Sequence, residues 1–281
     1  MLRFHQLHDA LVDLRLRFGR ASERRVAAEI LIVDRFKRDH VEIVAHAIAR
    51  DHRAGELRRL LDIVRRAWTQ IPLLTFVKNT VKITVVVTLL QLFTSSFAAY
   101  AFAKMQFKGK NALFLGYIAT IAVPWQAYMV PQFMMMSSWH LNNTHLAIMC
   151  LQAFSAFGVF LMKQFYEGVP TELCEAARID GLSEYGIWWH IMLPLSLPAL
   201  STLTIFTFVN TWNDFLGPLI YLTKTELKTI QIGLRMFITQ YSAEYGLIMA
   251  ASVVALIPVL IVFLSLQKYF VQGVASTGIK G

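Results

Sequence analysis

Five long apolar runs fill the second part of this chain and constrain its fold more than any other feature. They cover residues 81–103, 112–135, 145–162, 195–221 and 246–267 and contain almost no charged side chains. A helix needs about 20 residues to cross the hydrocarbon core of a bilayer, so four runs are long enough and the third is marginal. In lipid every backbone polar group must be satisfied within its own segment, which favours helices. The sequence therefore predicts an all-α polytopic membrane protein with about five transmembrane helices.

The composition supports this prediction. Hydrophobic residues make up 56% of the chain and charged residues 16%, against about 25% charged residues in ordinary soluble domains. These values exclude a disordered chain and argue against a wholly soluble one. The two cysteines, Cys150 and Cys174, exclude a disulfide scaffold and any four-cysteine metal site.

The chain divides in two near residue 67. Residues 1–67 contain 15 of the 27 basic residues, 14 of them Arg, whereas residues 68–281 contain ten Lys and only Arg178 and Arg235. We interpret the first part as a charged, Arg-rich N-terminal region and the second as a transmembrane domain. The first part cannot cross a bilayer, because each charge at a helix centre costs about 2.5–3.5 kcal/mol. Apolar residues at helical spacing in residues 57–68 indicate short amphipathic helices there.

The longest polar connection of the second part, residues 163–190, lies between the third and fourth apolar runs. Thr171 stands at a helix start, with acidic residues in the first turns that follow. Gly181 is a natural helix stop, and Ser183 can cap a second short helix. Pro194 is then expected to open the next membrane segment. The connection is thus predicted to form a helix, a sharp turn and another helix.

Seven residues within and just after this connection follow a recognisable pattern, E-A-A, three residues, G, nine residues and I-x-L-P: Glu175, Ala176, Ala177, Gly181, Ile191, Leu193 and Pro194. The pattern resembles the EAA loop of permease subunits of binding-protein-dependent ABC importers. The resemblance runs from about residue 69 to residue 281. TWNDF at 211–215, GPL at 217–219, IQIGL at 230–234 and YFVQGV at 269–274 are similar to the carbohydrate branch, particularly the second permease of maltose- and oligosaccharide-type systems.

The resemblance implies a multi-pass subunit of a bacterial inner membrane without catalytic activity of its own. It implies as partners a second permease, a cytoplasmic ATPase dimer, an external solute-binding protein and membrane lipid, with a sugar or oligosaccharide as cargo. It also implies that the EAA loop is a cytoplasmic coupling helix seated in the ATPase. Small Ala176 and Ala177 would let a partner approach closely, and Glu175 could accept charge-assisted hydrogen bonds.

Two groups of aromatic, amide and acidic residues interrupt the apolar runs and are candidates for lining a sugar pathway: Trp125, Gln126, Tyr128, Asn210, Trp212, Asn213 and Asp214. Aromatic rings suit the C–H faces of sugars, and amides suit their hydroxyl groups. An ionisable group in a membrane helix is a functional candidate. Asp214, however, lies about 29 Å beyond Leu195 at helical rise. A position near the far interface, or in a helix contact, therefore remains an alternative to pathway lining.

No nucleophile–base pair and no metal-ligand spacing emerges, which argues against an intramembrane enzyme. The tail from Gly273 to Lys280 lacks the Gly-Lys-Ser/Thr of a phosphate-binding loop, so we expect neither a nucleotide cofactor nor a metal. Two alternative functions are an ABC permease for a non-sugar solute and a membrane-anchored regulator with a basic N-terminal domain. The ten acidic residues within 1–67 and the lack of a recognisable DNA-binding pattern argue against nucleic acid as a partner.

The charge of residues 1–67 conflicts with the topology that the resemblance implies. A cytoplasmic EAA loop makes residues 103–111 cytoplasmic as well, in agreement with Lys104, Lys108 and Lys110. The region before residue 81 then falls outside, although its positive charge favours the inside. The family usually has a further membrane helix there. We therefore expect residues 1–67 not to be part of the transport machinery. A shifted reading frame, a misassigned start or a fused helical extension would each account for such a region.

Overall fold

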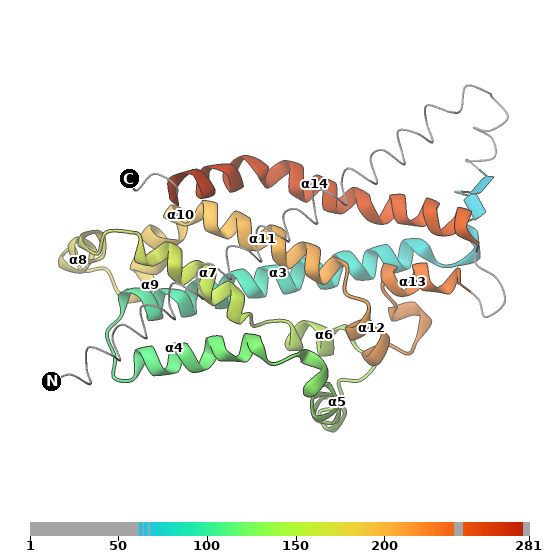
Figure 1. Ribbon diagram of the computed structural model, residues 1–281, viewed down its shortest axis with the longest axis horizontal. Coiled ribbons are helices and arrows are strands. Elements are labelled where there is room, and N and C mark those ends of the chain that lie inside the picture. The colour runs from blue at the N-terminus through green and yellow to red at the C-terminus, as the bar shows by residue number, and fades with distance from the viewer. Residues whose placement is uncertain (1–61, 64, 67, 239–243, 278–281) are drawn as a thin grey trace, which may run out of the picture. The chain divides into compact units, whose positions relative to one another are not determined.

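The computed structural model describes residues 62–63, 65–66, 68–238 and 244–277, with side chains as far as 268. The predictions made for residues 1–67 lie almost wholly outside this part. The described residues form helices and turns with no β-strand among them (Figure 1), as the apolar runs predict.

Two of the apolar runs form long unbroken helices. Helix α3 comprises Leu73–Lys104, 32 residues, which at helical rise is about 48 Å. Helix α14 comprises Tyr245–Thr277 and contains Pro258. Both are long and apolar enough to cross a membrane.

The second and third apolar runs are broken. The second consists of α4 (Lys110–Ala119), η1 (Thr120–Ala122), η2 (Trp125–Ala127) and α5 (Met129–Ser138). Its main break falls at Val123, which is extended with ψ 114° because a residue before proline avoids the helical region. The third run consists of α6 (His145–Leu151) and α7 (Ala156–Glu167), which meet at 43°.

The polar connection and the fourth run join through a sharp bend. The connection contains α8 (Glu172–Ile179), α9 (Glu184–Ile187), the π-helix η3 (Trp188–Met192) and α10 (Leu193–Leu195). Helix α11 (Leu197–Trp212) follows at 79°. The expectation that Pro194 opens this membrane segment is wrong, because the chain stays helical through Pro194 and bends at Ser196. Pro198 lies in the first turn of α11, where its missing N–H costs nothing.

Three short helices complete the order: α12 (Leu216–Tyr221), η4 (Thr225–Leu227) and α13 (Ile230–Met236). Two helices are candidate membrane spans, and four if each bent pair counts as one span, among the residues that the structure describes. The sequence-based number of five is therefore not confirmed, since the second run is too fragmented to qualify.

Helix α3 contacts both α7 and α11, and α11 also contacts α14 (Figure 1). A buried cluster around Tyr100, Tyr166 and Trp188 lies where α3 and α7 meet the polar connection. The α3–α7 approach is close, because a Cβ atom on Gly158 would lie 2.4 Å from the hydroxyl of Ser95. The polar connection thus packs against closely spaced helices α3 and α7.

Candidate functional site

Helix α8 ends in a motif that requires glycine. The N–H of Gly181 donates to the carbonyl of Arg178 at 3.0 Å, and the N–H of Leu182 donates to that of Ala177 at 3.0 Å. This pair of bonds defines a Schellman motif, whose penultimate residue is left-handed. Gly181 has φ +84°, which glycine adopts without strain. The predicted helix stop at Gly181 is confirmed.

The second short helix begins as predicted. The hydroxyl of Ser183 accepts a hydrogen bond from the N–H of Gly186 at 3.2 Å and so caps α9. Three side chains then tie the two helices to α3. The guanidinium of Arg178 donates to both carboxylate oxygens of Glu184, at 2.7 and 3.2 Å, and the hydroxyl of Tyr100 donates to the same carboxylate at 2.5 Å. The Glu184 hydrogen bond raises the pKa of Arg178.

Lys104, the last residue of α3, is buried and binds the residues that precede α8. Its ammonium donates to the carbonyl of Val169 at 2.5 Å and lies 3.5 Å from the hydroxyl of Thr171. The C-terminal end of α3 and helix α8 therefore lie at the same end of the described helices. This agrees with the expectation that both belong to one side of the membrane.

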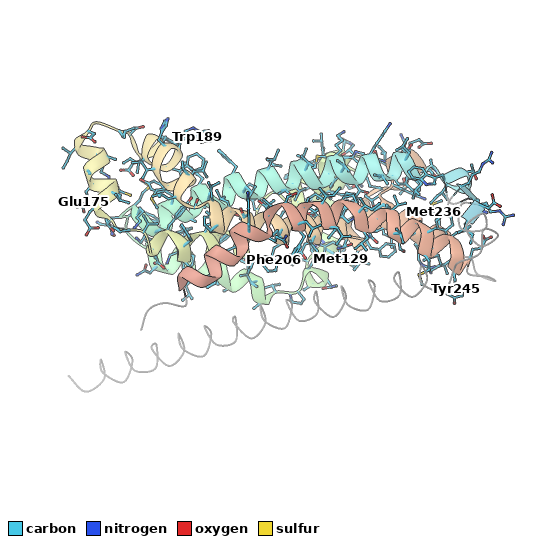
Figure 2. All side chains as sticks on the ribbon, turned by 90° about the horizontal axis from the view of Figure 1, so that it is seen from above. Met129, Glu175, Trp189, Phe206, Met236 and Tyr245 are labelled. Atoms are coloured by element: carbon cyan, nitrogen blue, oxygen red, sulfur yellow. The ribbon has the colours of Figure 1, made fainter. Side chains whose placement is uncertain are left out.

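The two faces of α8 differ in exposure. Glu175 and Ala176 are exposed, and Ile179 has 86% of its surface exposed. Cys174 and Ala177 face inward, where the Cys174 sulfur lies 3.8 Å from the sulfur of Met192. Burial raises the pKa of the Cys174 thiol. The carboxylate of Glu175 has no hydrogen bond or ion pair with any described residue. Figure 2 shows Glu175 and Tyr245 at opposite ends of the described helices.

The last three residues of the seven-residue pattern follow the coupling loop, and two of them pack against the buried cluster. Ile191 and Leu193 are half-buried against the cluster around Tyr100, and Pro194 is exposed. The neighbouring Trp188 is buried edge-on against Phe97, with ring centroids 5.3 Å apart. The pattern therefore contains exposed residues (Glu175, Ala176, Gly181 and Pro194) and residues packed against the chain (Ala177, Ile191 and Leu193).

The first group of pathway candidates is mostly exposed. Gln126 and Tyr128 are exposed, whereas Trp125 is half-buried and its indole N–H donates to the amide oxygen of Gln132 at 2.8 Å. Asn210, on α11, is also exposed. No hydrogen bond among the described residues joins the first group to the second.

The second group separates into core and surface. Trp212 is only 1% exposed; its indole N–H donates to the carbonyl of Ala255 at 2.9 Å, and its ring stacks on Phe208. It therefore holds α11 against α14 instead of facing an open path in this chain. Asn213 is exposed, and its amide oxygen accepts from Gln231 at 3.1 Å.

Asp214 is half-buried between α11 and α12, and one carboxylate oxygen accepts from the side-chain amide of Gln152 at 2.7 Å. This is a helix contact, the alternative that the sequence left open. Sequence reasoning missed Gln152 and Gln91 altogether. Their signal was present, since each is a lone amide within or beside an apolar run. No group of three or more potential metal-binding side chains occurs in the described part of the chain.

Comparisons with known proteins agree with this architecture. The family described as "Binding-protein-dependent transport system inner membrane component" matches residues 91–276. The arabinooligosaccharides transport system permease protein AraQ of Halalkalibacterium halodurans is 39% identical over 207 residues, 74% of each chain. The lactose transport system permease protein LacG of Rhizobium radiobacter is 36% identical over 214 residues, which cover 76% of this chain and 78% of LacG.

A solved structure is similar as well. It is the crystal structure of a bacterial ABC transporter involved in the import of the acidic polysaccharide alginate. The TM-score is 0.67 at 26% identity, over 74% of this chain and 79% of the matched chain.

Proposed function

The chain belongs to the family of inner membrane components of binding-protein-dependent transport systems, and from that premise we propose that it forms the translocation path for a sugar or oligosaccharide. Members of this family are permease subunits of ABC importers, which are transporters and not enzymes. They work with a partner permease, an ATPase and a binding protein. For this chain we propose a second, non-identical permease, a cytoplasmic ATPase dimer and an external sugar-binding protein, in a bacterial inner membrane.

The likeness to an arabinooligosaccharide permease and a lactose permease, at 39% and 36% identity, carries the sugar proposal. We propose that Gln126, Tyr128, Asn210, Asn213 and Asp214 face or border the path. The first four side chains are exposed in the isolated chain and are therefore available to a solute or to a partner permease, whereas Asp214 is half-buried, accepts from Gln152 and would only border the path.

A reconstituted importer tests the sugar proposal. The chain is assembled in proteoliposomes with its partner permease, ATPase and binding protein, and labelled arabinooligosaccharide, lactose and a non-sugar osmolyte are offered in turn. We expect ATP-dependent accumulation of one of the two saccharides only. Accumulation of the osmolyte alone would assign the chain to the non-sugar alternative.

We also propose that the exposed face of α8 docks on the ATPase. Three features support this: the exposed Glu175 carboxylate, which has no hydrogen bond or ion pair with a described residue, the small Ala176 beside it, and the 86% exposure of Ile179. Ala177 contributes differently, because it is buried and lets α8 lie close to the cluster beneath.

A matched pair of substitutions tests this docking face. Ala176→Arg places a bulky cation on the face, and Ala112→Arg places the same side chain on an exposed position of α4. We expect the ATPase to co-purify with the Ala112→Arg chain and to be lost from the Ala176→Arg chain. Equal recovery of the ATPase with both variants would contradict the docking proposal.

A further inference from the structure

A layer of hydrogen-bonded side chains crosses the apolar interior of the described helices. It comprises residues from α3, from the α6–α7 break and from the end of α11: Gln91, Thr94, Gln152, Thr207, Thr211 and Asp214. Gln91 lies 13 residues before Lys104, the last residue of α3, which is about 20 Å of helix. The layer therefore lies inside a hydrocarbon core about 30 Å thick.

Helix α3 provides partners for the break between α6 and α7. The side-chain amide of Gln91 donates to the carbonyl of Gln152 at 2.7 Å, and the hydroxyl of Thr94 donates to the carbonyl of Ala153 at 2.9 Å. A helix break frees backbone carbonyls, and in lipid each unsatisfied one is costly. Gln91 and Thr94, one turn apart on α3, satisfy two of them.

A second break follows α11, and Asp214 organises it. One carboxylate oxygen accepts from the N–H of Gly217 at 3.1 Å, at the start of α12. A Cβ atom on residue 217 would lie 2.5 Å from the other carboxylate oxygen. Glycine therefore makes room for the carboxylate at this position.

The side chain of Gln152 joins the two breaks. Its amide N–H donates to Asp214 at 2.7 Å, and its amide oxygen accepts from the hydroxyl of Thr211 at 3.2 Å. Gln91 makes a parallel contact, since its amide oxygen accepts from the hydroxyl of Thr207 at 2.8 Å. The amide N–H and the amide oxygen of Gln152, in the α6–α7 break, thus both form hydrogen bonds with the end of α11 and the residues that follow it.

We propose that Gln152 is a positioning residue for transport, which fastens the α6–α7 break to the α11–α12 break so that both shift as one unit. The proposal rests on the transport function proposed above. A hydrogen bond to a carboxylate is strong in a low-dielectric interior, and leaving either partner unpaired there is unfavourable. The bond therefore persists while the surrounding helices change position. In many secondary transporters discontinuous membrane helices form the solute site, and rigid groups of helices move around that site.

The test measures the distance between the two segments in the assembled importer. Nitroxide labels are placed at exposed Phe154, in the first break, and at exposed Leu219, on α12, with Cys150→Ser to remove the exposed native thiol. Distance distributions are recorded by electron paramagnetic resonance without nucleotide and after trapping with ATP and vanadate. Gln152→Leu is compared with Gln164→Leu, an exposed glutamine of α7.

We expect one distribution in both states for the otherwise unchanged chain and for Gln164→Leu. For Gln152→Leu we expect a broadened or shifted distribution in the trapped state, with transport slowed on the order of tenfold. In the double variant Gln152→Leu with Asp214→Leu, thermal stability recovers in part, because the carboxylate that lost its amide partner is removed, although the Thr211 hydroxyl and the Gly217 N–H lose their acceptors; the distribution stays broad.

Three results would overturn the proposal. They are a shift between the two states in the chain with Gln152 intact, an unchanged distribution in Gln152→Leu, and recovery of the distribution in the double variant, which would make the role purely structural. Because nucleotide alone sets the two states, the result does not depend on which solute is carried. A failure of the sugar proposal would therefore leave this test intact.

Discussion

Substituting Gly181 separates a backbone requirement of the coupling loop from a requirement for space. Gly181 has φ +84°, and a Cβ atom there would meet no atom within 4 Å. A side chain at this position is therefore penalised by conformation alone, by roughly 1–2 kcal/mol for a residue with a Cβ atom. That free energy corresponds to roughly a 5–30-fold loss of the α8–turn–α9 geometry. Asn tolerates the left-handed region better than Ala, and β-branched Val tolerates it worst.

We therefore expect transport per ATP hydrolysed to fall in the order Gly181, Gly181→Asn, Gly181→Ala, Gly181→Val. The assay is uptake and phosphate release measured on the same proteoliposomes. Gly109 provides a matched control, because it has φ +80°, has no atom within 4 Å of its Cβ position and lies in the connection before α4. Gly109→Val bears the same backbone penalty outside the coupling loop and should leave the ratio unchanged.

Gly181→Val and Gly109→Val should be equal in backbone strain and different in coupling. If both variants retain the ratio of the unsubstituted chain, the turn does not transmit force to the membrane helices. If both lose it equally, general destabilisation explains the effect, and thermal unfolding of the two variants would show it.

Reversing the Arg178–Glu184 pair tests the tie between α8 and α9: Arg178→Glu should lower coupling, and adding Glu184→Arg should restore part of it, which uptake per ATP hydrolysed measures. Because both side chains are 37% exposed, the ion pair itself contributes only about 0.2–1 kcal/mol to stability. If uptake per ATP hydrolysed does not recover in the double variant, the proposed tie between α8 and α9 is contradicted. Cys174 is buried with a raised thiol pKa, so maleimide should label exposed Cys150 first and Cys174 only after unfolding, as mass spectrometry of the digested chain would show. Trp212→Phe removes the indole N–H that donates to a carbonyl of α14 and should reduce the free energy of unfolding by about 1–3 kcal/mol, measured by thermal unfolding in detergent; no change would mean that this bond contributes little.

The local elements followed from the order of the residues alone. The long apolar runs over 81–103 and 246–267 predicted helices that the structure contains, because a helix in lipid satisfies its backbone internally. The loop was equally predictable: Gly181 permits a positive φ and Ser183 caps the next helix. Both effects act within a few residues, so the local amino-acid sequence is enough to specify them.

The three-dimensional packing set what those elements contact. It placed the bend at Ser196 and buried Trp212 against α14. It also brought Gln152 to Asp214, 62 positions away in the sequence. Helical periodicity identifies which residues share a face of one helix, but it does not specify which other helix covers that face. Burial and hydrogen bonding between distant segments depend on the packing of the whole chain, and for that reason the polar layer was not visible in the sequence.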